Sequence, residues 1–457
     1  MAEQDGLLEQ PPAHRVLRSV GLPVTPQGIA LVAELGPHAY RRLAELVTAD
    51  VAADCLERWN HPFFAKTDGS SPEPFRRALA GGVAMGLSLE RFRDSTACLP
   101  LYDEVAWTDF FESAVAGPDR CRIRIGLAPE LYQRWVPESR KQGEESWSEG
   151  LKLTRDGLFY ELGIRFPRIE VAPDSTLRQH QLRITWNDLW LPPHDGIADD
   201  RLMVNDTVER LFLIRVDGAE PTLNPANGSL CSTVPLSYKE RCEAAELTTW
   251  NASGRAILTV SAVLRCVAFA FVNRLLVFHA MSELAVGFPA LIEQCNQHLN
   301  RDHVVHVLRG LVQEGVSFRN FRAILEVMLS PRRVASASSP EDLLRVVRSS
   351  LQRQISHKYG SGRRLAVCLL GQEIEARLEQ PVELSEAERH VLHEGLALYD
   401  NVSAKSPVIL TRVGIRRRLY ELVCGRFPQF AVLSYDEIDP DYDIQPFARL
   451  EADLRPV

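Results

Sequence analysis

The sequence lacks the short motifs by which many enzymes can be recognised. Its 457 residues contain no G-x-S-x-G, no G-x-x-x-x-G-K-[ST] and no G-x-G-x-x-G that leads into a helix. Gly360-Ser361-Gly362 is followed by two arginines and a strand-like run, which is typical of a linker rather than a phosphate-binding loop. We therefore predict that the chain is not an enzyme, has no catalytic residues and needs no cofactor.

Metal-binding and disulfide patterns are also absent. The nine cysteines are scattered without any C-x-x-C pair, so we expect small buried side chains in a reducing compartment. Two groups of histidines stand close in sequence but lack the ligand spacing of a zinc site. The groups are His298, His303 and His306, and His390 with His393. We predict that they are surface histidines and that there is no metal site.

No long uncharged apolar run is present. The most apolar stretch, residues 256–280, contains Arg265 and Arg274. A central arginine costs about 2.5–3.5 kcal/mol on insertion scales, so the stretch predicts a buried core helix rather than a membrane span. The first residues do not resemble a secretory signal, and we expect a cytoplasmic protein. A net charge of −8 argues against nucleic acid as a partner.

What the sequence does contain is the composition of a multi-domain globular protein. Hydrophobic residues make up 45% and charged residues 25% of the chain, and its length suggests about three or four domains. Residues 1–120 have apolar positions at helical spacing, which predicts a helical region. Strict alternation at 122–125 and the runs 168–172, 182–186 and 211–216 predict strands, with a short helix at 158–163 and a turn at 224–228.

The C-terminal half begins as helix and then alternates. Residues 253–358 predict several helices, one of them opened by Ser339 as N-cap with Pro340 at its first position. Beyond them, strands at 365–370, 407–411 and 430–435 alternate with helices at about 372, after the capping box Ser385–Glu388, and at 413–427. Arg416-Arg417-Arg418 has two interpretations, a patch for an acidic partner or a solvated helix face.

Three segments of this half carry a resemblance to a known family. They are VSFRNFRAILEVML (316–329), DLLRVVRSSLQRQI (342–355) and SPVILTRVGIRRRLYELVCGRFPQFAVLSYDEID (406–439). In this order and spacing they resemble the cytoplasmic part of the export-gate (FHIPEP) family of bacterial type III secretion and flagellar export. A weaker likeness at 158–184 and at the NPANG turn extends the resemblance over residues 121–457.

The resemblance implies an α+β multi-domain fold. After the helical N-terminal region that the apolar spacing predicts, it has small α/β subdomains, a helical superhelix subdomain and a C-terminal α/β sandwich. The expected boundaries are 121–205 with 252–271 for the first subdomain, 206–251 for an inserted second, 272–360 for the helical third and 361–457 for the fourth. Residues 1–120 match no family that we recognise and have an unknown role.

The resemblance also implies a function, a soluble protein-docking module related to type III secretion. Its partners would be secretion-apparatus components or substrate–chaperone complexes, with a homo-oligomeric ring as the assembly, in the cytoplasm or at the inner face of the inner membrane. The implied partner-binding cleft residues are Asn224, Pro225, Asn227 and Leu258. Where the family has an acidic residue and a phenylalanine, this chain has Asn224 and Asn227, so an aromatic anchor is missing. The alternative is a regulatory scaffold whose residues 1–120 carry the specific activity.

Overall fold

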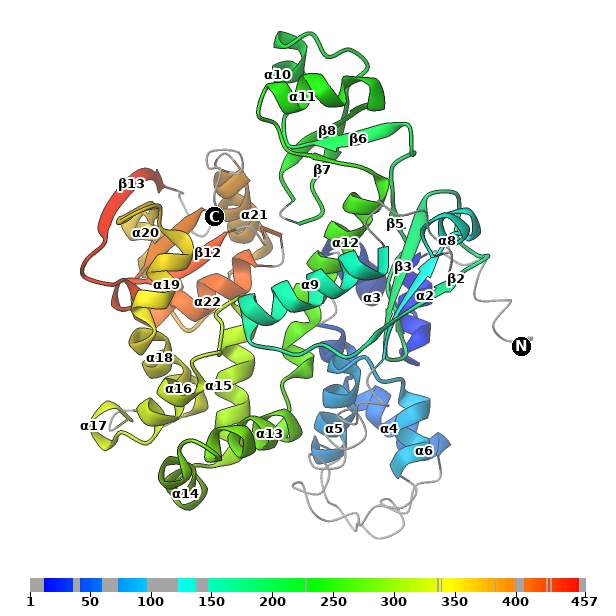
Figure 1. Ribbon diagram of the computed structural model, residues 1–457. Coiled ribbons are helices and arrows are strands. Elements are labelled where there is room, and N and C mark those ends of the chain that lie inside the picture. The colour runs from blue at the N-terminus through cyan, green and yellow to red at the C-terminus, as the bar shows by residue number, and fades with distance from the viewer. Residues whose placement is uncertain are drawn as a thin grey trace. The chain divides into compact units, whose positions relative to one another are not determined.

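A computed structural model gives the fold of the chain (Figure 1). The structure describes residues 12–35, 42–59, 73–96, 122–136, 147–226, 228–334, 337, 339–382, 384–397, 399, 407–424, 426–427 and 430–451. It divides into two compact units, each described by itself below. The first comprises Met1–Met203 with Val234–Glu283, and the second comprises Val204–Thr233 with Leu284–Val457.

The first unit begins with helices, as predicted for residues 1–120. The regular helices are α2 (Pro12–Ser19), α3 (Pro26–Leu35), α4 (Ala49–Arg58), α5 (Glu73–Ala84) and α6 (Leu89–Thr96). Thr48 caps α4, because its side chain accepts the N–H of Val51. Trp59, Phe75 and Phe92 pack their rings together, with centroids 5.8–6.2 Å apart, and give these helices an aromatic core.

A mixed sheet follows in the same unit. Its strands are β1 (Ile123–Leu127), β2 (Ile169–Pro173), β3 (Gln181–Trp186), β4 (Leu189–Trp190) and β5 (His194–Asp195), in the order β2-β1-β3-β4 with β5 beside β3. β1 runs parallel to β2 and antiparallel to β3. The strands predicted at 122–125, 168–172 and 182–186 are confirmed. The short helix predicted at 158–163 is the end of a longer one, α9 (Trp147–Leu162), and α8 (Pro129–Trp135) follows β1.

The most apolar stretch forms α12 (Ala252–Val267), the 3-10 turn η3 (Ala268–Phe271) and α13 (Arg274–Ala285). Ala252–Phe271 is long and apolar enough to cross a membrane, but 61% of its most apolar window is buried inside the structure. Arg265 on α12 is ion-paired with Glu161 of α9 at 2.9 Å. The helix is thus packed among neighbouring elements, as predicted for a core helix of a globular protein.

A small sheet is built from the segment 201–250. Its strands are β6 (Arg201–Val204), β7 (Glu220–Leu223), β8 (Leu230–Pro235) and β9 (Thr249–Trp250), in the order β7-β8-β6-β9. The helices α10 (Val208–Leu213) and α11 (Lys239–Ala244) belong to the same segment. The boundary between the two compact units falls within this segment.

The strand predicted at 211–216 is wrong. Residues up to Leu213 are the helix α10, which ends with Val216 N–H donating to the Leu211 carbonyl at 3.1 Å and Arg215 N–H donating to that of Phe212 at 3.0 Å. This is a Schellman end, in which Arg215 (φ +59°) takes the left-handed position that glycine usually fills. A short apolar run does not distinguish a strand from a helix. Because no glycine stands at position 215, the sequence carries no signal for the end of a helix there.

Helices dominate the next part of the second unit. They are α14 (Pro289–His298), α15 (Arg301–Gln313), α16 (Phe321–Met328), α17 (Pro331–Val334), α18 (Pro340–Ser350) and α19 (Gln352–Tyr359). α18 starts as predicted, because Ser339 accepts the Asp342 N–H at 3.1 Å and Pro340 occupies the first helical position. The apolar face of α15 packs against α18, where the Leu344 side chain lies directly over Gly310.

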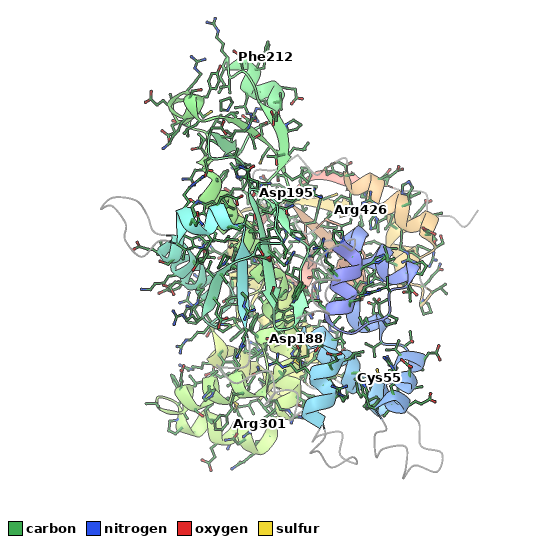
Figure 2. The ribbon with its side chains drawn as sticks, turned by 90° about the vertical axis from the view of Figure 1, so that its right-hand side faces the viewer. Cys55, Asp188, Asp195, Phe212, Arg301 and Arg426 are labelled. Atoms are coloured by element: carbon green, nitrogen blue, oxygen red, sulfur yellow. The ribbon has the colours of Figure 1, made fainter. Side chains whose placement is uncertain are left out.

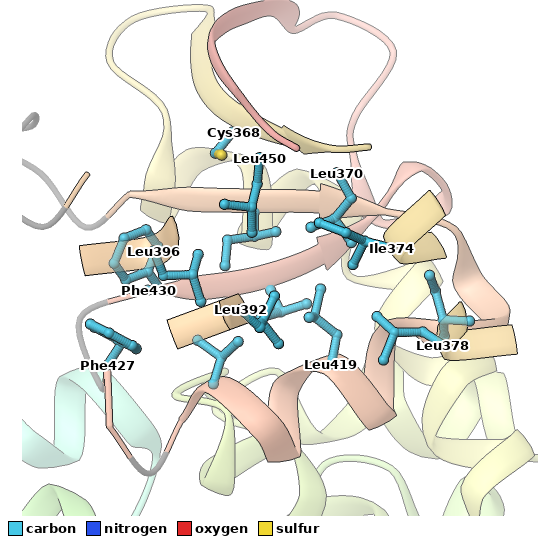
Figure 3. Packing of buried hydrophobic residues seen from close by; sticks show 14 of the residues in the cluster. Cys368, Leu370, Ile374, Leu378, Leu392, Leu396, Leu419, Phe427, Phe430 and Leu450 are labelled. Carbon is cyan, nitrogen blue, oxygen red and sulfur yellow. The ribbon is translucent and has the colours of Figure 1, made fainter. Parts of the chain in front are cut away.

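The chain ends in a parallel sheet covered by helices. Its strands are β10 (Arg364–Leu370), β11 (Val408–Thr411), β12 (Ala431–Ser434) and β13 (Asp443–Leu450), in the order β12-β11-β10-β13. The helices are α20 (Gln372–Glu379), α21 (Glu386–Ala397) and α22 (Val413–Val423), and a 3-10 turn, η4 (Tyr435–Glu437), follows β12. Figure 3 shows Leu392 and Leu419 from two of these helices pointing toward the sheet's Leu370 and Leu450.

Two sequence signals for this part are confirmed. The capping box before α21 forms in both directions, with Ser385 N–H donating to the Glu388 carboxylate at 2.7 Å and Glu388 N–H donating to Ser385 Oγ at 3.3 Å. The predicted strands 365–370, 407–411 and 430–435 are β10, β11 and β12. The α+β fold class predicted from the sequence is therefore confirmed, while the subdomain boundaries stay predictions.

Candidate partner-binding surface

The turn at residues 224–229 joins β7 to β8 and is held from both sides. Asn224 N–H donates to the Ser229 carbonyl at 2.9 Å, and Gly228 N–H donates to the Asn224 carbonyl at 2.8 Å. The Asn224 side chain accepts the Ala226 N–H at 2.9 Å, and Asn224 is only 8% exposed. Its amide is therefore used to shape the turn. Gly228 has φ +74°, which a residue with a side chain rarely adopts.

Two leucines flank this turn and face solvent. Leu223 ends β7 and Leu230 begins β8, and the two are paired across the strands. Leu223 is 56% and Leu230 is 50% exposed. Paired residues in an antiparallel ladder have neighbouring side chains, so the two leucines form one apolar spot beside the turn. The sequence already carried the signal, a leucine on each side of the NPANG turn, but the residues we predicted were those of the turn and Leu258.

The predicted site residues fall into different parts of the molecule. Pro225 lies in the turn and is half-buried, and Asn227 lies outside the described residues. Leu258 is half-buried on α12 in the first unit, whereas Asn224 and Pro225 belong to the second. That these residues bind partners stays a prediction, and the geometry adds the Leu223–Leu230 pair to the turn.

A second apolar surface lies on α10. Phe212 is 71% and Leu213 is 78% exposed, while Leu211 on the same helix is fully buried. Figure 2 labels Phe212 on the outer side of this segment. Large apolar side chains that are exposed next to one another are typical of interaction surfaces, whereas single exposed ones are common on any protein. The sequence run LFLIRV gave no hint of them, because as a strand it would have buried alternate residues.

The arginine run 416–418 is used inside the second unit, so neither interpretation offered by the sequence holds. Arg416 is 5% exposed and pairs with Glu314 and with Glu437, the latter at 3.3 Å. Arg417 reaches Glu314 at 3.0 Å. The Arg418 guanidinium donates to the carbonyl of Leu378 at 2.8 Å, and also to those of Gln380 and Val382.

Arg348 of α18 completes this buried charge network. Its side chain, 1% exposed, is 2.6 Å from Glu437 and 3.1 Å from Glu314. Burial alone would raise the pKa of Glu314, but Arg348 and Arg416 outweigh it and lower the pKa from 4.5 to about 2. The network joins α15 and α18 to α22 and η4 within the second unit. Each charge in it lies close to an opposite charge of the same unit, which is typical of a structural joint rather than a binding site.

The described histidines and cysteines do not form a metal site, and several of them are buried. Burial lowers the pKa of His194 to about 4, and His393 Nε2 donates a hydrogen bond to the Leu422 carbonyl at 3.0 Å. Among the seven described cysteines, five are buried as predicted, and burial raises the pKa of Cys295 and Cys368 to about 11. Across these residues no three metal-binding side chains come together.

Comparison with known proteins places most of the chain in one group. Residues 122–443 match the model of a family described as the FHIPEP family. The chain is 26% identical over 322 residues to the low calcium response locus protein D of Yersinia pestis, covering 66% of this chain and 44% of that protein. It is 23% identical over 317 residues to the invasion protein InvA of Salmonella typhimurium, covering 66% and 45%. The chain thus spans less than half the length of these relatives.

Solved structures share the fold. The Chlamydia pneumoniae CdsV protein, in a complex with CdsO, superimposes with a TM-score of 0.64 at 23% identity, covering 72% of this chain and 97% of that one. The cytosolic domain of EscV from a type III secretion system, a nonameric assembly, gives 0.58 at 19% identity, covering 74% and 99%. The described residues 12–96 precede the start of the family match at 122.

Proposed function

Because this chain belongs to the FHIPEP family, we propose that it is a protein-docking module of type III secretion that binds partners at the β7–β8 hairpin. The single observation that carries the proposal is the pair of exposed leucines, Leu223 and Leu230, on either side of a turn fixed by Asn224. An apolar spot on a rigid support can bind without first paying for its own ordering. Docking of this kind does not require catalytic residues.

The partners we propose are proteins, either components of the secretion apparatus or substrate–chaperone complexes. One structural relative is solved with a second protein, CdsO, and another is a nonameric cytosolic assembly. By extension we propose that this chain acts in the cytoplasm, including the inner face of the inner membrane, and assembles as a ring. Leu223 and Leu230 replace the aromatic anchor that is missing at Asn227, which predicts a partner different from the usual chaperones of the family.

In-cell photo-crosslinking tests the proposal. A photoreactive amino acid placed at position 223 is compared with the same residue at position 153, since Leu153 is also an exposed leucine (61%) but lies on α9. We expect secretion-apparatus or chaperone proteins to be crosslinked at position 223 and not at 153. Equal labelling of the same proteins at both positions, or none at 223 in secreting cells, would contradict the proposal.

A further inference from the structure

The N-terminal helices contact the hairpin formed by β3 and β4 through two separate segments, all within the first unit. One arm is the end of α2, where Ser19 Oγ accepts the N–H of Trp190 at 3.1 Å. The other arm consists of the link between α5 and α6 together with the start of α6, residues 85–91. Figure 2 shows Asp188, in the hairpin turn, where the sheet meets these helices. We call the two arms together the clasp.

The second arm makes backbone contacts on both turn residues. Asn187 Nδ2 donates to the Met85 carbonyl at 2.8 Å, and Asp188 N–H donates to the Gly86 carbonyl at 3.0 Å. The Asp188 carboxylate accepts from Ser88 N–H at 3.1 Å, from Ser88 Oγ at 3.3 Å and from Arg91 at 3.1 Å. One carboxylate thus receives three donors from the start of α6, a helix N-terminus that favours negative charge.

The two arms are also joined to each other. Leu89 N–H donates to the Val20 carbonyl at 3.0 Å, and both side chains are buried. A side-chain atom added to Gly21, which has φ +77°, would lie 3.2 Å from Leu89 Cβ. The two arms therefore pack against each other as well as against the hairpin, although about 65 residues of sequence separate them.

The fit at the hairpin depends on one glycine. Gly86 has φ +72°, and a Cβ added to it would lie 2.9 Å from the Trp186 carbonyl oxygen and 3.2 Å from the indole ring. Trp186, which is 1% exposed, is the largest fully buried side chain of the described residues. A backbone that approaches this closely, in a conformation suited to glycine, indicates a surface shaped for the hairpin.

We propose that the β3–β4 hairpin is an intrachain docking site whose ligand is the chain's own N-terminal helical region, residues 12–96. The clasp joins residues that precede the family match to residues inside it. It holds through its own contacts and does not require the covalent connection through residues 97–121. A partner recognised by the described helices of residues 12–96 is therefore bound by a fixed part of the first unit and not by a separately tethered domain.

The test uses the full chain with a protease recognition sequence inserted between residues 97 and 121. None of the clasp contacts described above involves that segment. After complete cleavage, size-exclusion chromatography with light scattering measures whether the two fragments elute together, and a dilution series gives their dissociation constant. We expect the wild-type fragments to stay bound at micromolar concentration. Separation of two folded wild-type fragments at that concentration would overturn the proposal.

Variants distinguish the clasp from general adhesion. Asp188→Ala removes the acceptor of three hydrogen bonds and should weaken the cleaved complex by roughly 10–100-fold. Glu90→Ala, its matched control, changes an exposed carboxylate on the same helix and should leave the dissociation constant unchanged. If Asp188→Ala impairs folding, Arg91→Ala serves instead, with a loss of up to about fivefold because that ion pair is partly exposed. Equal affinity for wild type and variants would contradict the proposal.

Discussion

The clasp of the first unit and the charge network of the second unit perform the same task by different means. Each fixes helices to a part of the chain that lies far away in sequence. The clasp uses backbone hydrogen bonds, a glycine contact and a carboxylate whose partner Arg91 is 34% exposed. The network uses Arg348 and Glu314, whose side chains are 1% and 3% exposed. From this difference we expect loss of the partly exposed Arg91 charge to cost the clasp little, and loss of a buried charge to cost the network much more.

The largest effect is expected from breaking the network. Glu314→Gln removes a buried charge that faces Arg348, Arg416 and Arg417, so the guanidinium groups lose their compensation. Breaking a buried pair on one side costs about 3–5 kcal/mol. Urea unfolding measures the loss of free energy. Glu326→Gln, the control, affects an exposed pair with Arg322 and should cost less than about 0.5 kcal/mol. Similar values for the two variants would place the network among ordinary surface pairs.

Next in size is a steric break of the clasp. Gly86→Val forces a branched side chain into a left-handed position next to the Trp186 carbonyl, and roughly 1–3 kcal/mol of stability should be lost. Gly81→Ala, on the preceding helix α5, meets open space and should be neutral or slightly stabilising. Thermal unfolding followed by tryptophan fluorescence compares the two. Equal stability of both variants would show that the close approach at Gly86 is not needed.

A pH titration separates the two regions further. The folded pKa of Glu314 is about 2, below its ordinary value of 4.5, so its contribution is fully present above pH 4.5 and is lost as the pH falls toward 2. The stability difference between wild type and Glu314→Gln should therefore shrink over this window. Denaturant unfolding at pH 7, 4 and 3 measures it. A difference that stays constant down to pH 3 would mean that Glu314 is not held ionised by its arginines.

The smallest effect is expected from the exposed edge of the clasp. Arg91→Ala should cost the uncleaved chain about 0.2–1 kcal/mol, because the Arg91–Asp188 pair is partly solvated. The cost should fall further in 0.5 M salt, since screening acts on exposed pairs. Denaturant unfolding at low and high salt gives both numbers. A cost of several kcal/mol that ignores salt would mean that this pair behaves like the buried network.

Local signals in the sequence predicted local structure well. The cap at Ser339, the capping box Ser385–Glu388 and the strand–helix alternation of the last hundred residues all reappear, because each depends on neighbours in the chain. The strand at 211–216 failed because Arg215 takes the left-handed position at the end of α10. A single sequence without a glycine there gives no sign of this.

Contacts between distant residues could not be predicted. Arg416 and Glu314 are 102 positions apart, and Ser88 and Asp188 are 100 apart. The local sequence around each residue does not identify its distant partner. We therefore predicted a surface position for the arginine run and did not predict the contact between the N-terminal helices and the sheet. For the candidate site, the resemblance supplied the turn at Asn224, but the exposure of Leu223 and Leu230 depends on how the hairpin packs.

The central claim is that the β7–β8 hairpin docks a secretion partner, and binding of the partner identified by crosslinking at position 223 tests it most directly. Isothermal titration calorimetry would compare the wild type, the double variant Leu223→Asp/Leu230→Asp and the control Leu153→Asp, which alters an equally exposed leucine elsewhere. The account predicts at least about tenfold weaker binding for the double variant and unchanged binding for the control. Unchanged binding by the double variant would contradict it.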